Sequence, residues 1–224
     1  MQKISYKRHR FHSSIIKQAV WLYFKFSLSY RDVECLMSQR GIEVSYETIR
    51  RWVYKFGPKY AAHIRKSRRK VSKNWHLDEV FVSMGKRRYY LWRAVDDEGE
   101  VLDVLVQKRR NKKAALRLIR RLLKNIDTHP KTIVTDRLGS YGAALRDLGM
   151  SKLHIMGGRS NNRAENSHLP IRKQERKMQR FKSKKSAQIF LSIYGPIYNL
   201  FNTQQHLVPR LIMKDLRITA FKNW

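Results

Sequence analysis

The hydrophobic spacing of this chain changes near residue 74, and this change restricts the possible folds more than any other feature. Before this point, apolar residues recur every three or four positions, as they do in amphipathic helices. After it, polar and apolar residues alternate with the period of two that is typical of strands. We therefore expect an all-α region followed by an α/β domain. The alternating segments are Trp75 to Val82, Tyr89 to Val95 and Val101 to Val106.

The first 63 residues predict three short helices with a glycine-containing turn. The first helix covers Ile15 to Phe26, and the second begins at a capping box, Ser29 to Asp32, and stops at Gly41. Ser45 caps a third helix, which we expect to end at Gly57-Pro58. This arrangement is typical of a helix-turn-helix, although bundles that do not bind DNA share it.

In a helix-turn-helix, the last helix enters the major groove and its early exposed residues reach the base edges. The basic segment Arg65 to Lys73 follows, and we interpret residues 64–74 as a linker that is either solvated or in contact with phosphates. The residues of the third helix that we predict to contact DNA are Tyr46, Glu47, Arg50, Arg51 and, nearer the phosphates, Lys55.

The net charge supports a polyanionic partner. Lys and Arg number 49 against 17 Asp and Glu, which gives a charge of +32. Like charges at this density repel one another in the compact state, and binding to nucleic acid would relieve that repulsion. Composition alone leaves two alternatives, a basic ribosomal-type protein or a charge that serves only solubility.

The sequence lacks the features of a disulfide, a cysteine zinc cluster, a membrane span and a signal peptide. The single cysteine, Cys35, cannot form an internal disulfide or a cysteine zinc cluster. Its place beside Val33 and Leu36, on a helix whose apolar residues face inward, predicts that it is buried. No apolar run has the length of a membrane span, and the N-terminus lacks an apolar signal core, so we expect a cytosolic protein.

Residues 75–204 predict a single α/β domain with the element order βββαβαβα. This order is typical of an antiparallel meander that continues into a mixed sheet. The final helical part begins near Asn162, with expected interruptions at Pro170 and Gly195-Pro196. The elements expected between the meander and this part are a helix from Lys112 to Leu123, a strand from Thr132 to Thr135, a helix from Ser140 to Leu148 and a strand from Lys152 to Met156.

Three acids stand out because of where they lie in this pattern. Asp78 lies on the apolar face of the first strand, where an ionised group needs a charged partner. Asp136 follows a buried strand at its carboxyl end, a common place for functional side chains. Glu165 lies in a stretch crowded with Arg and Lys. Brought together, three such oxygen donors would suit Mg²⁺ or Mn²⁺ and the displacement of a phosphodiester.

The chain also contains four separated segments in a fixed order: WHLDEVFV, YYLWRAVDDEGEVLDVLV, IVTDRLGSYGAAL and NNRAENSHLPIRKQERKMQRFKS. Together with the earlier segment SYRDVECLMSQRGIEVSYETIRRWV, they resemble the DDE transposases of bacterial insertion sequences, most closely the insertion sequence six family. The resemblance implies an RNase H-like fold and Mg²⁺-dependent 3′-end cleavage and strand transfer at terminal inverted repeats, with cointegrate products. It assigns Asp78, Asp136 and Glu165 as the catalytic, metal-binding triad.

The spacing within this triad departs from many members of the family. Only 28 residues separate Asp136 from Glu165, fewer than is usual, which leaves Glu175 as a rival third carboxylate. On one helix the two glutamates would lie about 15 Å apart and point to different sides. The geometry of a helix therefore favours Glu165.

Basic residues around the acids are expected to line the path of the DNA. The resemblance assigns Arg172 to a contact near the DNA end. His168, one turn after Glu165, either touches a phosphate or the metal shell or is a plain surface histidine. The other residues that we predict to contact the DNA backbone are Arg109, Arg110, Lys112, Lys173, Arg176 and Lys182.

The resemblance implies double-stranded DNA as partner, both transposon ends and target, in a bacterial cytoplasm. Pairing two ends requires a homodimer or a higher homo-oligomer. The apolar stripe from Ile189 to Phe201 either packs on the sheet or forms that interface. The alternatives are a domesticated or regulatory helix-turn-helix protein that binds without cutting, and a structure-selective RNase H-like nuclease. The expected domains are 1–63, a linker 64–74, a catalytic domain 75–204 and a tail 205–224.

Overall fold

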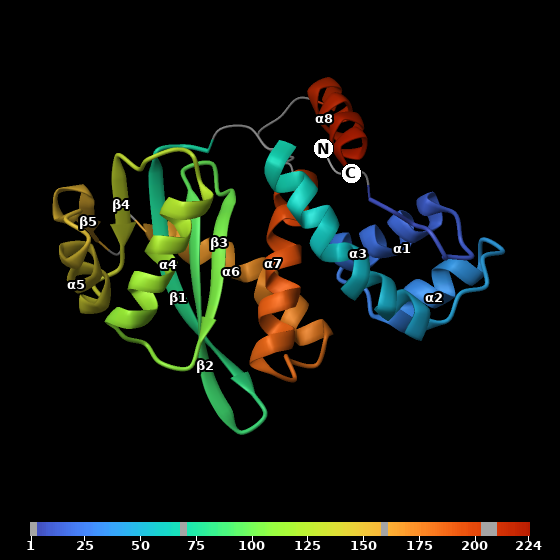
Figure 1. Cartoon of the computed structure of the whole chain (residues 1–224), viewed down its shortest axis with the longest axis horizontal. Helices are drawn as coiled ribbons and strands as arrows, with labels where there is room; N and C mark the ends of the chain where they lie inside the picture. The colour runs from blue at the N-terminus through green and yellow to red at the C-terminus, as the bar shows by residue number, and fades with distance from the viewer. Residues whose placement is uncertain (1–3, 68–70, 158–160, 203–209) are drawn as a thin grey trace. The chain divides into compact units, whose positions relative to one another are not determined.

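The computed structural model describes residues 4–67, 71–157, 161–202 and 210–224, and the side chains of Asn162, Arg163 and Glu165 lie outside this description. Contacts divide the chain into two units (Figure 1). A helical unit combines residues 1–68 with 196–224, and an α/β unit comprises residues 69–195. The expected domain boundaries at residues 63, 74 and 204 stay predictions.

In the described residues of the helical unit, there are four helices and the end of a fifth. The predicted capping box is present: Ser29 Oγ accepts the Asp32 amide at 3.1 Å, and the Asp32 carboxylate accepts the Ser29 amide at 2.9 Å. Gly41 ends the turn after the second helix with a φ of +71°, a conformation that favours glycine. The helices are α1 (Ser13–Lys25), α2 (Tyr30–Ser38), α3 (Tyr46–Ser67) and α8 (Arg210–Asn223), joined by the end of α7 (Lys184–Phe201).

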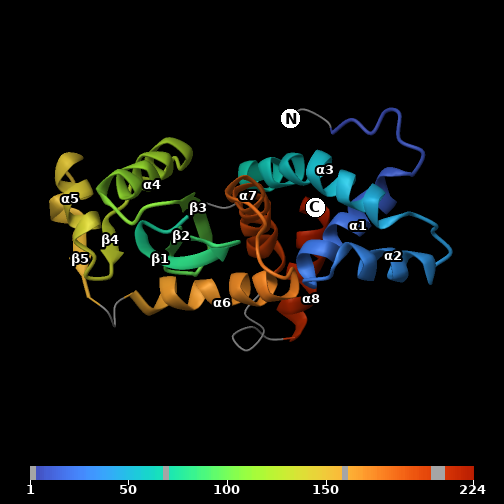
Figure 2. The same ribbon diagram turned by 90° about the horizontal axis from the view of Figure 1, so that it is seen from below.

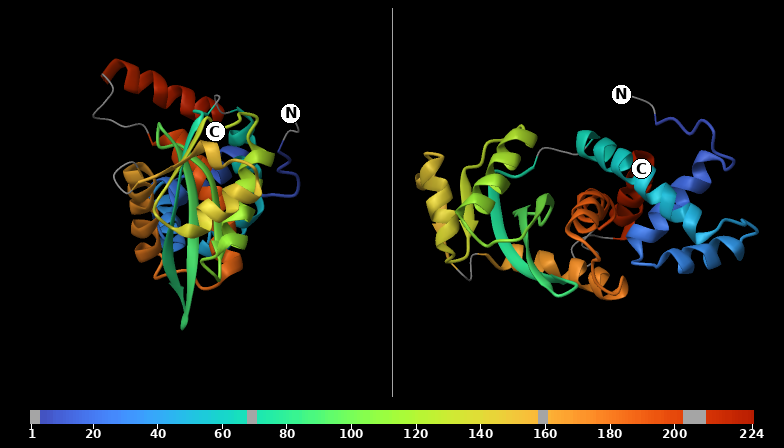
Figure 3. Two further views of the ribbon diagram at one scale, coloured as in Figure 1. Left: turned by 90° about the vertical axis from the view of Figure 1, so that its left-hand side faces the viewer. Right: turned by 60° about the horizontal axis from the view of Figure 1, so that its bottom comes forward.

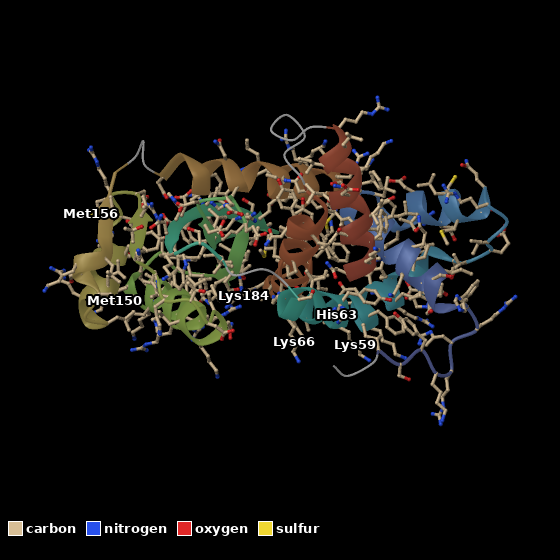
Figure 4. All side chains as sticks on the ribbon, turned by 90° about the horizontal axis from the view of Figure 1, so that it is seen from above. Lys59, His63, Lys66, Met150, Met156 and Lys184 are labelled. Carbon is tan, nitrogen blue, oxygen red and sulfur yellow. The ribbon has the colours of Figure 1, made fainter. Side chains whose placement is uncertain are left out.

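The third helix is longer than the sequence predicted. It continues through Pro58 to Ser67, so the expected end at Gly57-Pro58 is wrong. A proline inside a helix removes one backbone hydrogen bond and crowds the preceding turn. Burial of Tyr60 and Ile64 in the second half of the helix offsets that cost. Basic side chains follow the exposed side of this extension, among them Lys59, His63 and Lys66 (Figure 4).

Two further expectations about helices are corrected by the structure. Pro170 lies inside α6 (Asn162–Lys177) and Pro196 inside α7, so neither proline interrupts its helix. In α2 only one stripe is buried, and Leu36 and Cys35 are exposed, although both were expected to face inward. Within the described ranges, no helix combines the length and the apolar character needed to cross a bilayer.

The α/β unit contains a five-stranded sheet with the strand order β3-β2-β1-β4-β5. The first three strands form an antiparallel meander, and β4 and β5 continue the sheet in parallel with β1. This mixed order is RNase H-like and confirms the predicted βββαβαβα succession. The strands are β1 (Asn74–Met84), β2 (Arg87–Asp96), β3 (Val101–Gln107), β4 (Thr132–Thr135) and β5 (His154–Met156).

Helices cover both faces of this sheet. α4 (Lys112–Asn125) packs on one face and α6 on the other (Figure 2). On the α4 side, the core includes Trp75 and Trp92, both fully buried. α5 (Gly139–Asp147) follows β4 and leads to β5 through a short 3₁₀ turn. The far ends of β1 and β2 extend beyond their neighbours as a two-stranded ribbon (Figure 3).

Candidate active site

Two neighbouring parallel strands bring the first two predicted acids together. Leu77 of β1 pairs with Thr135 of β4, so Asp78 and Asp136, the next residue on each chain segment, come to the same edge of the sheet. The Leu138 amide donates to Asp136 Oδ1 at 3.0 Å, which holds that carboxylate in place. Asp78 and Asp136 therefore meet as the sequence predicted.

A third carboxylate, not predicted from the sequence, joins them. One oxygen from each of Asp78, Glu79 and Asp136 lies within 4.8 Å of the others. Neighbouring residues on a strand normally point to opposite faces, so Asp78 and Glu79 were not expected to share a site. The available signal was the adjacency of two acids in a chain that has few of them.

Arg110 lies against this acidic cluster. Its guanidinium donates to Glu79 Oε1 at 2.7 Å and lies 3.4 Å from Asp136 Oδ2. Asn111 caps the start of α4, because its side chain accepts the Ala114 amide at 3.1 Å, and this fixes the chain just after Arg110. Arg110, which we predicted to contact the DNA backbone, therefore also balances the negative charge of two carboxylates, Glu79 and Asp136.

The surroundings of Glu79 raise its pKa. Burial raises its pKa to about 7; the Tyr141 hydroxyl and the Arg110 guanidinium oppose this rise, and the negative charge of Asp136 adds to it. The Glu79 side chain is only 1% exposed. Negative charge is thus concentrated and incompletely compensated at this edge of a very basic protein.

The other face of β1 contacts α6 through Asp78. His168 Nε2 lies 3.2 Å from Asp78 Oδ2, and the pKa of His168 is lowered, mainly because the residue is buried. Asn161, at the start of α6, donates to the Leu77 carbonyl at 2.9 Å and ties the helix to the strand next to Asp78. The interpretation of His168 as a plain surface histidine is therefore wrong.

The third predicted acid lies on the same helix. Glu165 belongs to α6, one turn before His168, but its side chain lies outside the described residues. The rival Glu175 is half-buried further along α6, and its pKa is raised by burial against the opposing charges of Arg172 and Arg180. Among the described residues, the acidic cluster does not include Glu175. The choice of Glu165 stays a prediction.

The donor set fits a hard divalent cation. Mg²⁺ and Mn²⁺ prefer carboxylate oxygens, and such sites usually combine one or two carboxylates with water and phosphate oxygens. Asp78 on β1 and Asp136 directly after β4 supply these donors. Burial and the charge of Asp136 raise the pKa of Glu79, and a bound cation would oppose that rise. The residues present are therefore able to hold a divalent metal.

The predicted residues of the third helix lie at the beginning of α3, at the protein surface. Glu47 pairs with Arg50 at 2.6 Å and lies 3.9 Å from Arg51. The Arg31 guanidinium stacks over the Tyr46 ring, and Lys55 contacts His9 at 2.9 Å. These side chains are accessible, and their contact with DNA stays a prediction.

The remaining predicted backbone contacts are distributed around the α/β unit. Lys112 forms an ion pair with Asp147 at 2.7 Å. Arg172, on α6, lies with its guanidinium 5.7 Å from the centre of the Phe81 ring, on the ribbon end of β1. The others are exposed, and their roles stay predictions: Arg109, Lys173, Arg176 and Lys182.

Comparison with known proteins gives consistent matches. The family model of the DDE domain of IS240-type transposases matches residues 72–204, more than half of the chain. The transposase for insertion sequence-like element IS431mec of Staphylococcus aureus is 30% identical over 189 residues, which cover 82% of this chain and 84% of that protein. The transposase for insertion sequence element IS257 in transposon Tn4003 of the same organism has the same identity and coverage.

Among solved structures, the HTLV-2 integrase catalytic core domain in complex with magnesium aligns with a TM-score of 0.45 and 14% identity. The alignment covers 60% of this chain and 90% of that domain.

Proposed function

The chain belongs to the insertion sequence six family of DDE transposases, which are polynucleotidyl transferases, and we propose that it cleaves and joins the ends of its own insertion sequence. In this proposal, the substrates are terminal inverted repeats and a target duplex, the metal is Mg²⁺, with Mn²⁺ as a substitute, and the products are cointegrates.

One observation carries the proposal: Asp78 on β1 and Asp136 directly after the neighbouring parallel strand β4 lie side by side, with their oxygens within 4.8 Å. We assign these two residues and Glu165 as the catalytic carboxylates. When bound, Mg²⁺ would supply charge to activate the attacking hydroxyl and to stabilise the leaving 3′ oxygen. A binding protein without catalysis has no evident need for this acidic edge.

The surrounding residues keep the carboxylates in position. His168 on α6 lies beside Asp78. Asn161 donates to the Leu77 carbonyl at the start of α6, and this contact supports the assignment of Glu165, in the first turn of that helix, to the site. Arg110 offsets the negative charge of Asp136 and Glu79. In strand transfer, the 3′ hydroxyl of the transposon end would form a new bond to a target phosphorus while the target's own 3′ oxygen leaves.

The helical unit would provide recognition of the ends. The exposed start of α3 would enter the major groove with Tyr46, Arg50 and Arg51, and phosphate contacts elsewhere would position the duplex. Two transposon ends must be held together, so the active assembly would contain at least two copies of the chain.

A joining assay with pre-cleaved terminal-repeat DNA and a target plasmid tests the proposal. Asp78→Asn, Asp136→Asn and Glu165→Gln should each abolish Mg²⁺-dependent joining and leave terminal-repeat binding intact. Glu175→Gln is the matched control for the third carboxylate and should retain joining.

Two outcomes would contradict the proposal. Joining that survives all three substitutions would exclude this site. Specific binding by the wild-type chain without any joining would instead support a regulatory helix-turn-helix protein. If Glu175→Gln, rather than Glu165→Gln, abolished joining, the third catalytic residue would have to be reassigned.

A further inference from the structure

The outer side of α4 carries a row of cations that the proposed active site does not use. The helix contains six basic residues and no acid. Its apolar side, including Ala115, Leu118 and Ile119, is buried in the core beneath it. The α4 row, as we call it, consists of the exposed residues Lys113, Arg117, Arg120 and Lys124.

Only part of the charge of α4 is compensated within the protein. Lys112 pairs with Asp147 at 2.7 Å, and Arg121 pairs with Asp103 at 2.8 Å. For the four residues of the α4 row, no acidic side chain lies within ion-pairing distance in the described part of the chain. Their charge is available to a partner.

The spacing of the α4 row is unfavourable for an isolated helix. Lys113 and Arg117, like Arg120 and Lys124, are four positions apart, where like charges repel. Lys113 also lies in the first turn, where the helix dipole disfavours a cation. A polyanion bound along the helix would remove both penalties. The row, with Leu116 and Arg121, already lines a shallow groove along the helix.

The dimensions of the α4 row suit a DNA backbone. From Lys113 to Lys124 the helix rises about 16 Å, which corresponds to about five nucleotide steps of about 3.4 Å. The helix begins two residues after Arg110, which contacts Glu79 and lies near Asp136. The row therefore extends outward from the candidate active site.

We propose that the α4 row binds the sugar-phosphate backbone of the target duplex. This inference rests on the proposed function, because strand transfer requires two DNA segments beside one site. α6 and its cations Arg172, Lys173 and Arg176 lie on the opposite face of the sheet from α4 (Figure 2). We assign the α6 face to the transposon end. Target DNA must be held whatever its sequence, and contacts from Lys and Arg to phosphate provide this.

The test compares two triple variants of the full chain that each remove three positive charges from the α/β unit. The first replaces Arg117, Arg120 and Lys124 with Gln. The control replaces Lys131, Arg146 and Lys152 with Gln, which are exposed and lie off α4. Fluorescence anisotropy with a random-sequence duplex and with a terminal-repeat duplex, each over a series of salt concentrations, gives the affinity and its salt dependence.

For the α4 variant, the plot of log K against log salt should become less steep, and the magnitude of its slope should decrease by roughly 2.7. Each phosphate that a cation no longer neutralises reduces this magnitude by about 0.9. Its affinity near 0.1 M salt should fall about tenfold or more. The control variant should stay close to the wild-type slope. Equal decreases in the two variants would attribute binding to net charge and overturn the inference. A decrease confined to terminal-repeat DNA would overturn the assignment to target.

Thermal unfolding without DNA separates binding from folding. Because the substitutions remove repulsion within α4, the Tm of the α4 variant should equal or exceed that of the wild type. The binding assay needs no catalysis, so the two proposals fail separately. A chain that never joins DNA but shows the α4 effect would refute only the proposed reaction. A chain that joins DNA normally and shows no α4 effect would refute only this inference.

Discussion

Two glutamate–arginine pairs, one in each unit, have the same chemistry and nearly the same separation but different environments. Glu47 and Arg50 lie 2.6 Å apart on the exposed side of α3, and Glu79 and Arg110 lie 2.5 Å apart beside Asp136. The hydrogen bond from Arg50 lowers the pKa of Glu47, whereas burial raises the pKa of Glu79 to about 7 despite Arg110.

The difference shows that ion pairing alone does not mark a functional acid. Water screens the pair on α3, so that pair contributes little to folding. At the sheet edge, the protein has removed Glu79 from water and placed it close to Asp136, which leaves an unfavourable charge in the folded state. Such an arrangement is expected where a cation has to bind.

The largest effect should come from removing a carboxylate at the sheet edge. Asp136→Asn should reduce strand transfer by about 10³-fold or more, because metal stabilisation of developing charge is worth several kcal/mol. The stabilisation of the protein by Mn²⁺, measured as a Tm shift, should disappear as well. Asp147→Asn removes an exposed carboxylate from the same unit and should retain both properties. A normal Mn²⁺ shift in Asp136→Asn would contradict the assignment of the metal site.

Glu79→Gln should change how folding depends on pH. The pKa of Glu79 in the folded protein, about 7, lies above the ordinary value of 4.5, so the folded state binds more protons in this interval. Wild-type stability should therefore fall as pH rises from 4.5 to 7, and it should fall about 2–3 kcal/mol further than in the variant. Urea unfolding in the presence of a chelator measures this difference.

The exposed Glu98 provides the matched control for that experiment. The Glu98→Gln variant should follow the pH dependence of the wild type. If Glu79→Gln and the wild type had parallel profiles from pH 4.5 to 8, Glu79 would not carry the elevated pKa.

Arg110→Ala should have a smaller effect, confined to higher pH. The substitution removes the cation that opposes the charges of Glu79 and Asp136. Because the Arg110 side chain is 43% exposed, screening limits the loss of stability to about 1–2 kcal/mol above pH 7. The loss should shrink as pH falls towards 4.5, because Glu79 is then protonated in the folded state and no longer offers Arg110 a negative charge. Equal losses at both pH values would show that Arg110 does not act through the charge of Glu79.

The pair on α3 should give the smallest effect. Both side chains are exposed to water, so Glu47→Gln should leave the Tm unchanged within error between pH 5 and 8. The same variant should bind DNA with changed sequence preference if α3 enters the major groove, which selection from a random-sequence library would reveal. A Tm change as large as that of Arg110→Ala would remove the contrast between the two pairs.

Much of the fold could be predicted because its signals are local. The change in hydrophobic period marked where the sheet begins, and the capping box at Ser29 and the glycine at Gly41 placed the second helix. Asp78 and Asp136 were recognisable because an acid inside an apolar strand, or directly after one, is unusual. Each of these signals depends only on residues a few positions apart.

The sequence predictions were wrong, or missed a residue, where contacts between residues far apart in the chain determine the structure. Pro58 stays inside α3 because Tyr60 and Ile64 pack into a core formed by other segments. His168 is buried because α6 lies on the sheet, which no pattern within the helix specifies. Glu79 escaped notice because strand periodicity places it on the face opposite Asp78.

By itself, the sequence determined the element order, the basic character and two acids at strand positions, since periodicity, caps and charge are properties of neighbouring residues. Only the tertiary structure decided which side chains meet. The parallel register of Leu77 with Thr135 brings Asp78 to Asp136, and burial of the same edge raises the pKa of Glu79. Register and burial depend on contacts between segments far apart in the chain, and no local pattern encodes them.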